Sequence, residues 1–369
     1  MPGKKLSCAT IFGVLAIAGL LMGCGLLTPP KAYMYGTSGV MYRNPIFSHD
    51  GSSILVQAKS DLLLLGPDGS TIANLTKGVG TNTSARWSPD GRWVIFTSDR
   101  DGQKDIYRIR PDGSDSINLT NTIADDEDNP VYSPDGERII YYRCTKKRKE
   151  CVNGHLVTAH ADGRSQRIFA RDGWEAWWSP DSRWIAYIDI RGKGIWVQSP
   201  DGDDRRKLVD GKPISWTPDG SAIFYRPPRG GFDKNADVRR INIDGTGDRL
   251  VLKDYSVDEW WGGDPQRFWD PSGLLLALVV YRAIGLRDGG VVIVDRDGNV
   301  VSDFREQGGG FDYAHTSSWS PDGNWVLFRK YSGAPGQKWI GGAYLLNVRT
   351  SQQRQVIADE VQIIKREVP

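Results

Sequence analysis

The chain has little of the side-chain chemistry on which many enzymes depend. Its 369 residues include four histidines and four cysteines. No Gly-x-Ser-x-Gly and no His-Glu-x-x-His sequence occurs, which excludes a hydrolase nucleophile elbow and the zinc-binding helix of a metalloprotease. The cysteines form no second pair of ligands at a zinc spacing. We therefore expect a protein that is not an enzyme and that carries no metal and no cofactor.

An excess of charge of either sign is also missing. The chain has 47 Lys and Arg residues and 45 Asp and Glu residues, a formal net charge of +2. Two of the cations, Lys4 and Lys5, lie in an N-terminal segment that we expect to be removed, and without them the charges balance. Nucleic-acid binders rely on many contacts between cations and phosphates. A neutral body therefore argues against a nucleic-acid partner.

Apolar residues are modest in number, whereas glycine and tryptophan are abundant. The hydrophobic fraction is 39%, with 43 Gly and 14 Trp. The usual glycine content is about 7%, which this chain clearly exceeds. Many turns and many aromatic residues are typical of β-structure rather than of helices. The composition therefore predicts an all-β fold.

Only one long uncharged run occurs, and it lies at the N-terminus. Residues Leu6–Leu27 follow the two lysines and contain the ending Leu21-Met22-Gly23-Cys24. A basic start and an apolar core are typical of an export signal. The ending resembles a bacterial lipobox, although Met22 departs from the usual small or β-branched residue. This resemblance implies a lipoprotein signal peptide over 1–23, lipidation of Cys24, and a linker over 24–43.

Two other interpretations of this run stay open. About 20 apolar residues can span a bilayer, so the segment could be an uncleaved transmembrane anchor. It could also be a plain cleaved signal. All three interpretations place the body of the protein outside the cytoplasm, on the periplasmic side or at the cell surface. We expect an extracytoplasmic lipoprotein that is anchored to the membrane.

The remaining cysteine pair is Cys144 and Cys151, which flank a short basic stretch between two expected strands. In an exported protein, two cysteines around a hairpin tip indicate a disulfide. A pair of free thiols is the alternative.

The body of the chain repeats one motif, an aromatic residue followed by Ser-Pro-Asp-Gly or a variant of it. The motif aromatics are Phe47, Trp87, Tyr132, Trp178, Trp216, Trp269 and Trp319, at spacings between 38 and 53 residues. Seven copies at this period, together with β composition, predict a β-propeller.

Each repeat contains the pieces of a four-stranded unit. The motif turn is followed by an apolar strand, a polar loop, a second strand, and another turn such as Pro111-Asp112-Gly113. We name the four strands A to D from the centre outward. The sequence thus predicts a seven-bladed β-propeller of four-stranded antiparallel blades over 44–358, followed by a C-terminal tail over 359–369. Closure of the ring is expected from a strand added to blade seven by Tyr33–Tyr42 or Val361–Lys365.

The run Trp87–Thr120 resembles the TolB-type propeller repeat, and the resemblance covers about residues 44–358. It implies the fold but no single activity. Such repeats occur in envelope binding proteins, in the propeller domains of prolyl-oligopeptidase-like enzymes and in some pectate-degrading lyases. The lyase branch implies several histidines around a metal, and this chain offers only His315 near the expected channel.

The two faces of such a propeller differ. The A–B and C–D turns lie on one face, which we call the turn face, and the B–C and D–A connections lie on the other, the loop face. The turns repeat and are expected to be scaffold. The loops vary, and binding residues concentrate in variable loops on a rigid frame. We therefore expect the functional site on the loop face.

The best candidates precede the motif aromatics, where strand A begins beside the central channel. They are polar, they differ between blades, and convergent polar groups at a channel mouth are typical of a ligand site. The candidates are Arg43, Asp128, Glu175, Lys212, Asp264, Gln266 and His315, with Trp260 and Trp261 as stacking surface. The alternative is that these side chains only bind the neighbouring D–A connections.

The function predicted from these features is non-catalytic. We expect a membrane-anchored propeller in the cell envelope that acts as a protein-interaction scaffold, with a glycan as the second class of ligand. The alternative is a carbohydrate-active enzyme, a lyase or a hydrolase, that uses His315 and channel carboxylates. A structural lipoprotein with no specific ligand is a third interpretation.

Overall fold

The computed structural model describes residues 33–38, 42–147, 150–189, 194–228, 237–253, 256–257, 268–281, 289–306, 311–332, 340–359 and 362–367. The signal segment and Cys24 lie outside the described residues. Within the described segments the regular structure consists of strands, and none of their residues forms a helix long and apolar enough to cross a membrane.

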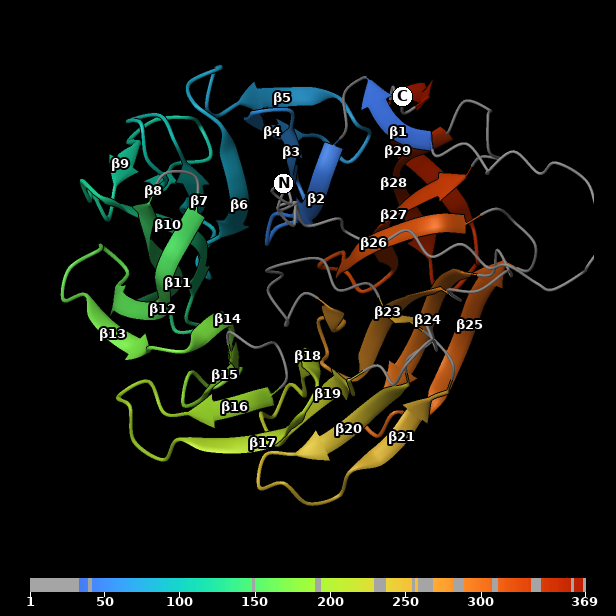
Figure 1. The fold of residues 1–369 in the computed structure, drawn as a ribbon. Coiled ribbons are helices and arrows are strands. Elements are labelled where there is room, and N and C mark those ends of the chain that lie inside the picture. The colour runs from blue at the N-terminus through green and yellow to red at the C-terminus, as the bar shows by residue number, and fades with distance from the viewer. Residues whose placement is uncertain are drawn as a thin grey trace, which may run out of the picture.

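Twenty-eight of the strands form seven sheets of four, arranged as a ring (Figure 1). Blade one comprises β2 (Tyr42–Phe47), β3 (Ile54–Ala58), β4 (Asp61–Leu65) and β5 (Thr71–Asn74). Blade two comprises β6 (Asn82–Trp87), β7 (Val94–Ser98), β8 (Asp105–Ile109) and β9 (Ile117–Asn118). Blade three comprises β10 (Asp125–Tyr132), β11 (Arg138–Lys147), β12 (Glu150–His160) and β13 (Arg167–Ala170).

The remaining blades follow in chain order. Blade four comprises β14 (Gly173–Trp178), β15 (Ile185–Asp189), β16 (Gly194–Gln198) and β17 (Arg206–Asp210). Blade five comprises β18 (Lys212–Trp216), β19 (Ala222–Arg226), β20 (Val238–Asn242) and β21 (Arg249–Leu252). Blade six comprises β22 (Ser256–Val257), β23 (Leu275–Tyr281), β24 (Gly289–Asp295) and β25 (Val300–Glu306). Blade seven comprises β26 (Phe311–Trp319), β27 (Trp325–Ser332), β28 (Ile340–Asn347) and β29 (Gln353–Asp359). The predicted all-β, seven-bladed fold is confirmed.

The motif builds the turn between the first two strands of a blade. In blade two, the Ser88 hydroxyl donates a hydrogen bond to Asp90 at 2.6 Å and accepts one from the Trp93 amide at 3.0 Å. Gly91 takes a φ of 69°, a conformation that glycine adopts without steric cost. Each motif turn therefore reverses the chain through its own side chains, which explains why the motif recurs.

The motif aromatics lie between blades, as predicted. The indole N–H of Trp216 donates to the Trp177 carbonyl of blade four at 3.3 Å. Trp269 donates in the same way to the Trp216 carbonyl of blade five at 2.7 Å, and Trp319 to the Phe268 carbonyl at 2.9 Å. These three indoles thus contribute apolar area and one interblade hydrogen bond each.

The ring closes differently from the prediction. Strand β1 (Tyr33–Ser38) pairs antiparallel with β30 (Gln362–Glu367) in a separate two-stranded sheet. The expectation that one of these segments joins blade seven is wrong, because blade seven already has its four strands from one continuous stretch. Blades one and seven meet through an apolar cluster that includes Ile54, Val56, Leu327 and Leu345.

The predicted disulfide is present. Cys144 and Cys151 are bonded, with their Cα atoms 5.5 Å apart. Cys144 is buried in the cluster shared by blades three and four, whereas Cys151 is exposed. The bond therefore ties the outer end of the long β11–β12 hairpin to the core.

The two Asn-Leu-Thr triplets have a structural role. Asn74 donates to the Asp61 carboxylate at 2.9 Å, and Thr76 donates to the same carboxylate at 3.0 Å. In blade two, Asn118 and Thr120 bind Asp105 at 2.9 and 3.1 Å. Each triplet thus anchors the end of strand D to the start of strand C.

Candidate functional site

A β-bulge interrupts strand A in six blades, within the five residues that precede the motif aromatic. The pairing register shifts between Arg43 and Ile46, Thr83 and Arg86, Asp128 and Val131, Gly173 and Ala176, Pro213 and Ser215, and His315 and Ser318. Bulges re-aim side chains and often occur beside functional sites. Of the positions nominated from the sequence, Arg43, Asp128, Glu175 and His315 fall within these bulges around the channel, and Lys212 directly precedes one.

Three residues of this ring have an unusual backbone. Asn44, Ser84 and Asn129 stand three residues before the motif aromatics of blades one to three, with φ values of 50°, 53° and 55°. Left-handed backbone at non-glycine residues is costly and concentrates at binding and catalytic sites. The same strained position therefore recurs around one side of the channel.

Asp128 lies in a network between blades two and three. Its carboxylate receives the Lys104 ammonium at 2.6 Å, the Thr97 hydroxyl at 3.0 Å and the Ser84 hydroxyl at 3.2 Å. The amide of Asn129 donates to it at 2.8 Å. Asp128 therefore joins β10 to β6, to β7 and to the B–C loop residue that directly precedes β8, and these partners are not the D–A connections that the alternative interpretation names.

Glu175 and Lys212 form the charged centre of the ring. The Trp174 indole donates to Glu175 at 3.2 Å. Burial raises the pKa of Glu175, and the positive charges of Lys212 and Arg86 oppose that rise. These residues come from β14, β18 and β6, so three blades place opposite charges close together.

Arg86 is a member of the site that the sequence interpretation missed. Its Nε donates to the Pro130 carbonyl at 3.0 Å, and its side chain is buried. A comparison of the seven repeats could have identified Arg86 as unusual. Arg86 directly precedes Trp87, and the other six repeats have an uncharged residue at that position.

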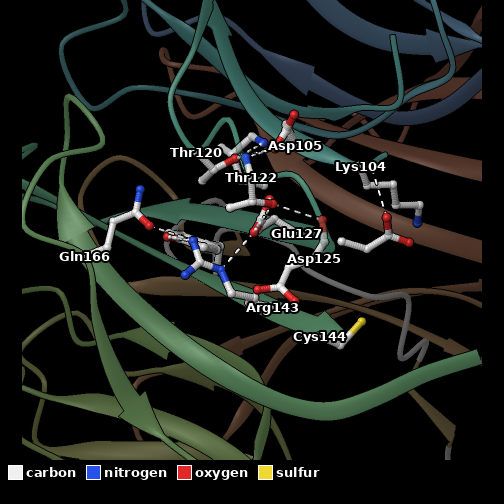
Figure 2. Close-up of polar contacts among 12 residues, drawn as sticks. Lys104, Asp105, Thr120, Thr122, Asp125, Glu127, Arg143, Cys144 and Gln166 are labelled. Atoms are coloured by element: carbon white, nitrogen blue, oxygen red, sulfur yellow. Dashed lines mark hydrogen bonds and ion pairs between the residues drawn. The ribbon is translucent and has the colours of Figure 1, made fainter. Parts of the chain in front are cut away.

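A second buried charged cluster lies between blades two and three, and Figure 2 shows its members pointing toward one another. The Glu127 side chain is 0% exposed, 2.8 Å from the Arg143 guanidinium and within hydrogen-bond distance of the Thr122 hydroxyl. Arg143 also donates to Gln166 at 2.6 Å. Burial raises the pKa of Glu127 to about 7, against the opposing charge of Arg143 and with a further increase from Asp105.

Two of the other sequence candidates are described by their backbones. The backbones of Arg43 and His315 lie in β2 and β26, at the bulges. Asp264, Gln266, Trp260 and Trp261 lie outside the described residues. Their part in the site stays a prediction. In the part of the chain that the structure describes, no group of three or more His, Cys, Asp or Glu side chains is placed to hold a metal ion.

Seven sheets around one channel, each with the motif turn between its first two strands, define a seven-bladed β-propeller. Residues 33–212 match the family model of the TolB beta propeller domain. This match spans the first four blades and identifies a TolB-like propeller in that part of the chain.

Individual relatives match only parts of the chain. An uncharacterised protein of Agrobacterium fabrum is 34% identical over 115 residues, which cover 29% of this chain and 39% of that protein. The Tol-Pal system protein TolB of Syntrophus aciditrophicus is 45% identical over 47 residues, 13% of this chain and 10% of that protein. The chain thus spans less than half the length of these two relatives.

Among solved structures, an oligogalacturonate lyase from Vibrio parahaemolyticus superposes with a TM-score of 0.62 at 13% identity, over 87% of this chain and 98% of that one. A puromycin-hydrolysing peptidase from Mycobacterium tuberculosis gives a TM-score of 0.61 at 13% identity, over 86% of this chain and 53% of that one. At such identities these likenesses show the fold alone.

Proposed function

We propose that this protein is a non-catalytic interaction scaffold of the cell envelope, extracytoplasmic and anchored to the membrane through a lipidated Cys24. The anchor rests on the Leu21-Met22-Gly23-Cys24 ending. The scaffold role rests on the ring of strand-A bulges, which carries different polar residues in six blades around one channel.

The observation that carries the proposal is the charged centre of that ring. Glu175, Lys212 and Arg86 come from three blades and interact electrostatically, although nothing in the repeat requires charges at these places. Charges held on a rigid frame select partners by electrostatic complementarity. The charged centre therefore provides specificity for a partner, which the repeated motif turns cannot provide because they are nearly identical.

An envelope protein is the partner class that we favour. A relative by sequence carries the name Tol-Pal system protein TolB, which supports a protein partner in an envelope assembly. A glycan is the second ligand class, because Trp174 lies beside Glu175 with its indole partly exposed and aromatic rings stack on sugars. The lyase-like fold of one structural neighbour leaves a carbohydrate-active enzyme as the alternative.

The test is recovery of partners from envelope membranes with a tagged protein. The double variant Glu175→Gln with Lys212→Gln removes both charges without changing the net charge. It should recover at least about tenfold less partner, the equivalent of 1.4 kcal/mol. The matched control is Lys207→Gln with Asp210→Asn, an exposed ion pair on the outer strand of blade four, which should recover as much as the wild type.

Two outcomes would contradict the proposal. Equal recovery by the double variant would remove the charged centre from the interface. Turnover of an oligogalacturonate by the wild type, lost in His315→Ala, would make the protein an enzyme with its site at the channel mouth.

A further inference from the structure

The channel widens on the turn face into a funnel of about 760 Å³. All seven motif aromatics line it, together with the motif prolines of blades two to seven. His49 occupies the place of the proline in blade one. Ligand sites commonly enclose about 300–1,000 Å³ and are lined mainly by apolar and aromatic side chains. The face expected to be scaffold alone therefore contains a cavity with the size and lining of a binding site.

The rim of the funnel is acidic. The motif turns 48–53, 88–93, 133–138, 179–184, 217–222, 270–275 and 320–325 carry eight carboxylates and three arginines. Arg296 also reaches the rim, where it donates to the Gly273 carbonyl, and the excess is then four negative charges. Hydrogen bonds from Ser48 and Ser52 lower the pKa of Asp50 to about 2, and those from Ser320 and Asn324 lower the pKa of Asp322. These carboxylates thus stay charged in neutral and mildly acidic solution.

We propose that this funnel binds a basic, extended segment of a protein, with lysine or arginine side chains inserted between the acidic rim and the aromatic wall. Cations bind the faces of Trp and Tyr rings, and their aliphatic stems cover apolar surface. A carboxylate follows directly after the lining residue in six of the seven turns, and Asp270 itself lines the funnel. One side chain can therefore contact both groups.

Among the described residues that line the funnel, Arg86 alone carries a fixed positive charge. Its Nε is held by the Pro130 carbonyl, and its charge interacts with Glu175. The rim carboxylates, at the mouth of the funnel, therefore dominate the field that an approaching segment meets. Arg86 borders both this funnel and the charged centre of the ring. The variants that test the two proposals change different residues, so the proposed function can fail while this proposal stands, and the reverse.

The test uses the purified full chain and a fluorescein-labelled peptide of about twelve residues that carries four arginines. The measurement is fluorescence anisotropy at low salt, where attraction between surface charges is screened least. A peptide of the same length with glutamates in place of the arginines is the probe control. We expect the arginine peptide to bind and the glutamate peptide not to bind.

Two matched triple variants locate the binding. Asp50→Asn, Asp219→Asn and Asp322→Asn remove three charges from the rim, while an amide oxygen can still accept the hydrogen bonds of each turn. Asp68→Asn, Asp112→Asn and Asp244→Asn make the same change in outer turns, where the aspartates accept equivalent hydrogen bonds. The rim triple should weaken binding about tenfold, since charge complementarity carries the recognition, and the outer triple by less than about twofold.

Three results would overturn the proposal. The wild type does not bind the arginine peptide. The two triples lose affinity equally, so that the attraction is a general effect of surface charge. A neutral oligosaccharide binds, and the arginine peptide does not, which would make the funnel a glycan site.

Discussion

The burial and pKa of a charged residue between blades depend on how the neighbouring blades pack around it. Glu127 is enclosed by Thr122 and Asp105 and paired with Arg143. In sequence it is one member of the acidic run Asp125–Asp128, which looks like a solvated loop. Only the packing of blade three against blade two removes this one carboxyl from water.

The raised pKa of Glu127 predicts a specific dependence of stability on pH. Its pKa rises from 4.5 to about 7 on folding, so the folded state holds the proton more tightly than the unfolded state. The associated stability is fully present below about pH 4.5 and is lost as the pH rises through about 7. Urea unfolding of the wild type and of Glu127→Gln at pH 4.5 and pH 8 should show a wild-type loss of the order of 2 kcal/mol relative to the variant. Parallel pH profiles of the two proteins would contradict the assignment.

Residue roles that depend on local contacts could be predicted from the sequence, whereas roles that depend on contacts between blades could not. The turn residues Ser88, Asp90 and Gly91 act locally, so their pattern is enough to identify them. The contacts of Asp128 with Lys104 and Thr97 join residues of different blades. A sequence gives no distance between blades. The charge at Arg86, alone at its repeat position, was the available signal.

Among the strands and hairpins, the β11–β12 hairpin is the element whose two strands are linked by the Cys144–Cys151 disulfide. Its strands continue past the core, where Tyr142 pairs with Leu156, to the outer pairs Thr145–Val152 and Lys146–Cys151. Cys144 anchors this extension in the apolar cluster of blades three and four. The disulfide therefore fixes the extension, whereas the core of the blade holds the inner part.

Reduction should loosen the extension before the blade. Closing a loop of this size stabilises a protein by roughly 2–3 kcal/mol on the chain-entropy model. In Cys151→Ala, amide hydrogen exchange should speed up across 144–152 and stay slow across Ile139–Tyr142. Unfolding in urea should require less denaturant than for the oxidised wild type. Unchanged exchange across 144–152 would mean that strand pairing alone holds the extension.

The whole molecule is a ring whose blades each come from one continuous segment. This arrangement explains why the fold could be predicted: the motif marks every blade in order. It also explains why closure was predicted wrongly, because no pattern in Tyr33–Ser38 or Gln362–Glu367 shows that these two segments pair with each other.

Removal of residues 360–369 tests the role of the terminal pair. The deletion leaves β1 without its partner but keeps the cluster between blades one and seven. We expect a lower Tm with an unchanged β-type circular dichroism spectrum. A deletion that abolishes folding would show that β30 is required for the ring, and an unchanged Tm would show that the pair contributes nothing to closure.

The central claim is that a partner docks on the loop face, over the ring of bulges. The most direct measurement is photo-crosslinking in intact envelopes, with a photoreactive amino acid placed at Thr83 or Pro213 on the ring, or at Ser114 in an outer turn of blade two. Probes at 83 and 213 should capture the same envelope protein, and the probe at 114 should not. Capture of that protein from position 114, with none from 83 and 213, would contradict docking on the loop face.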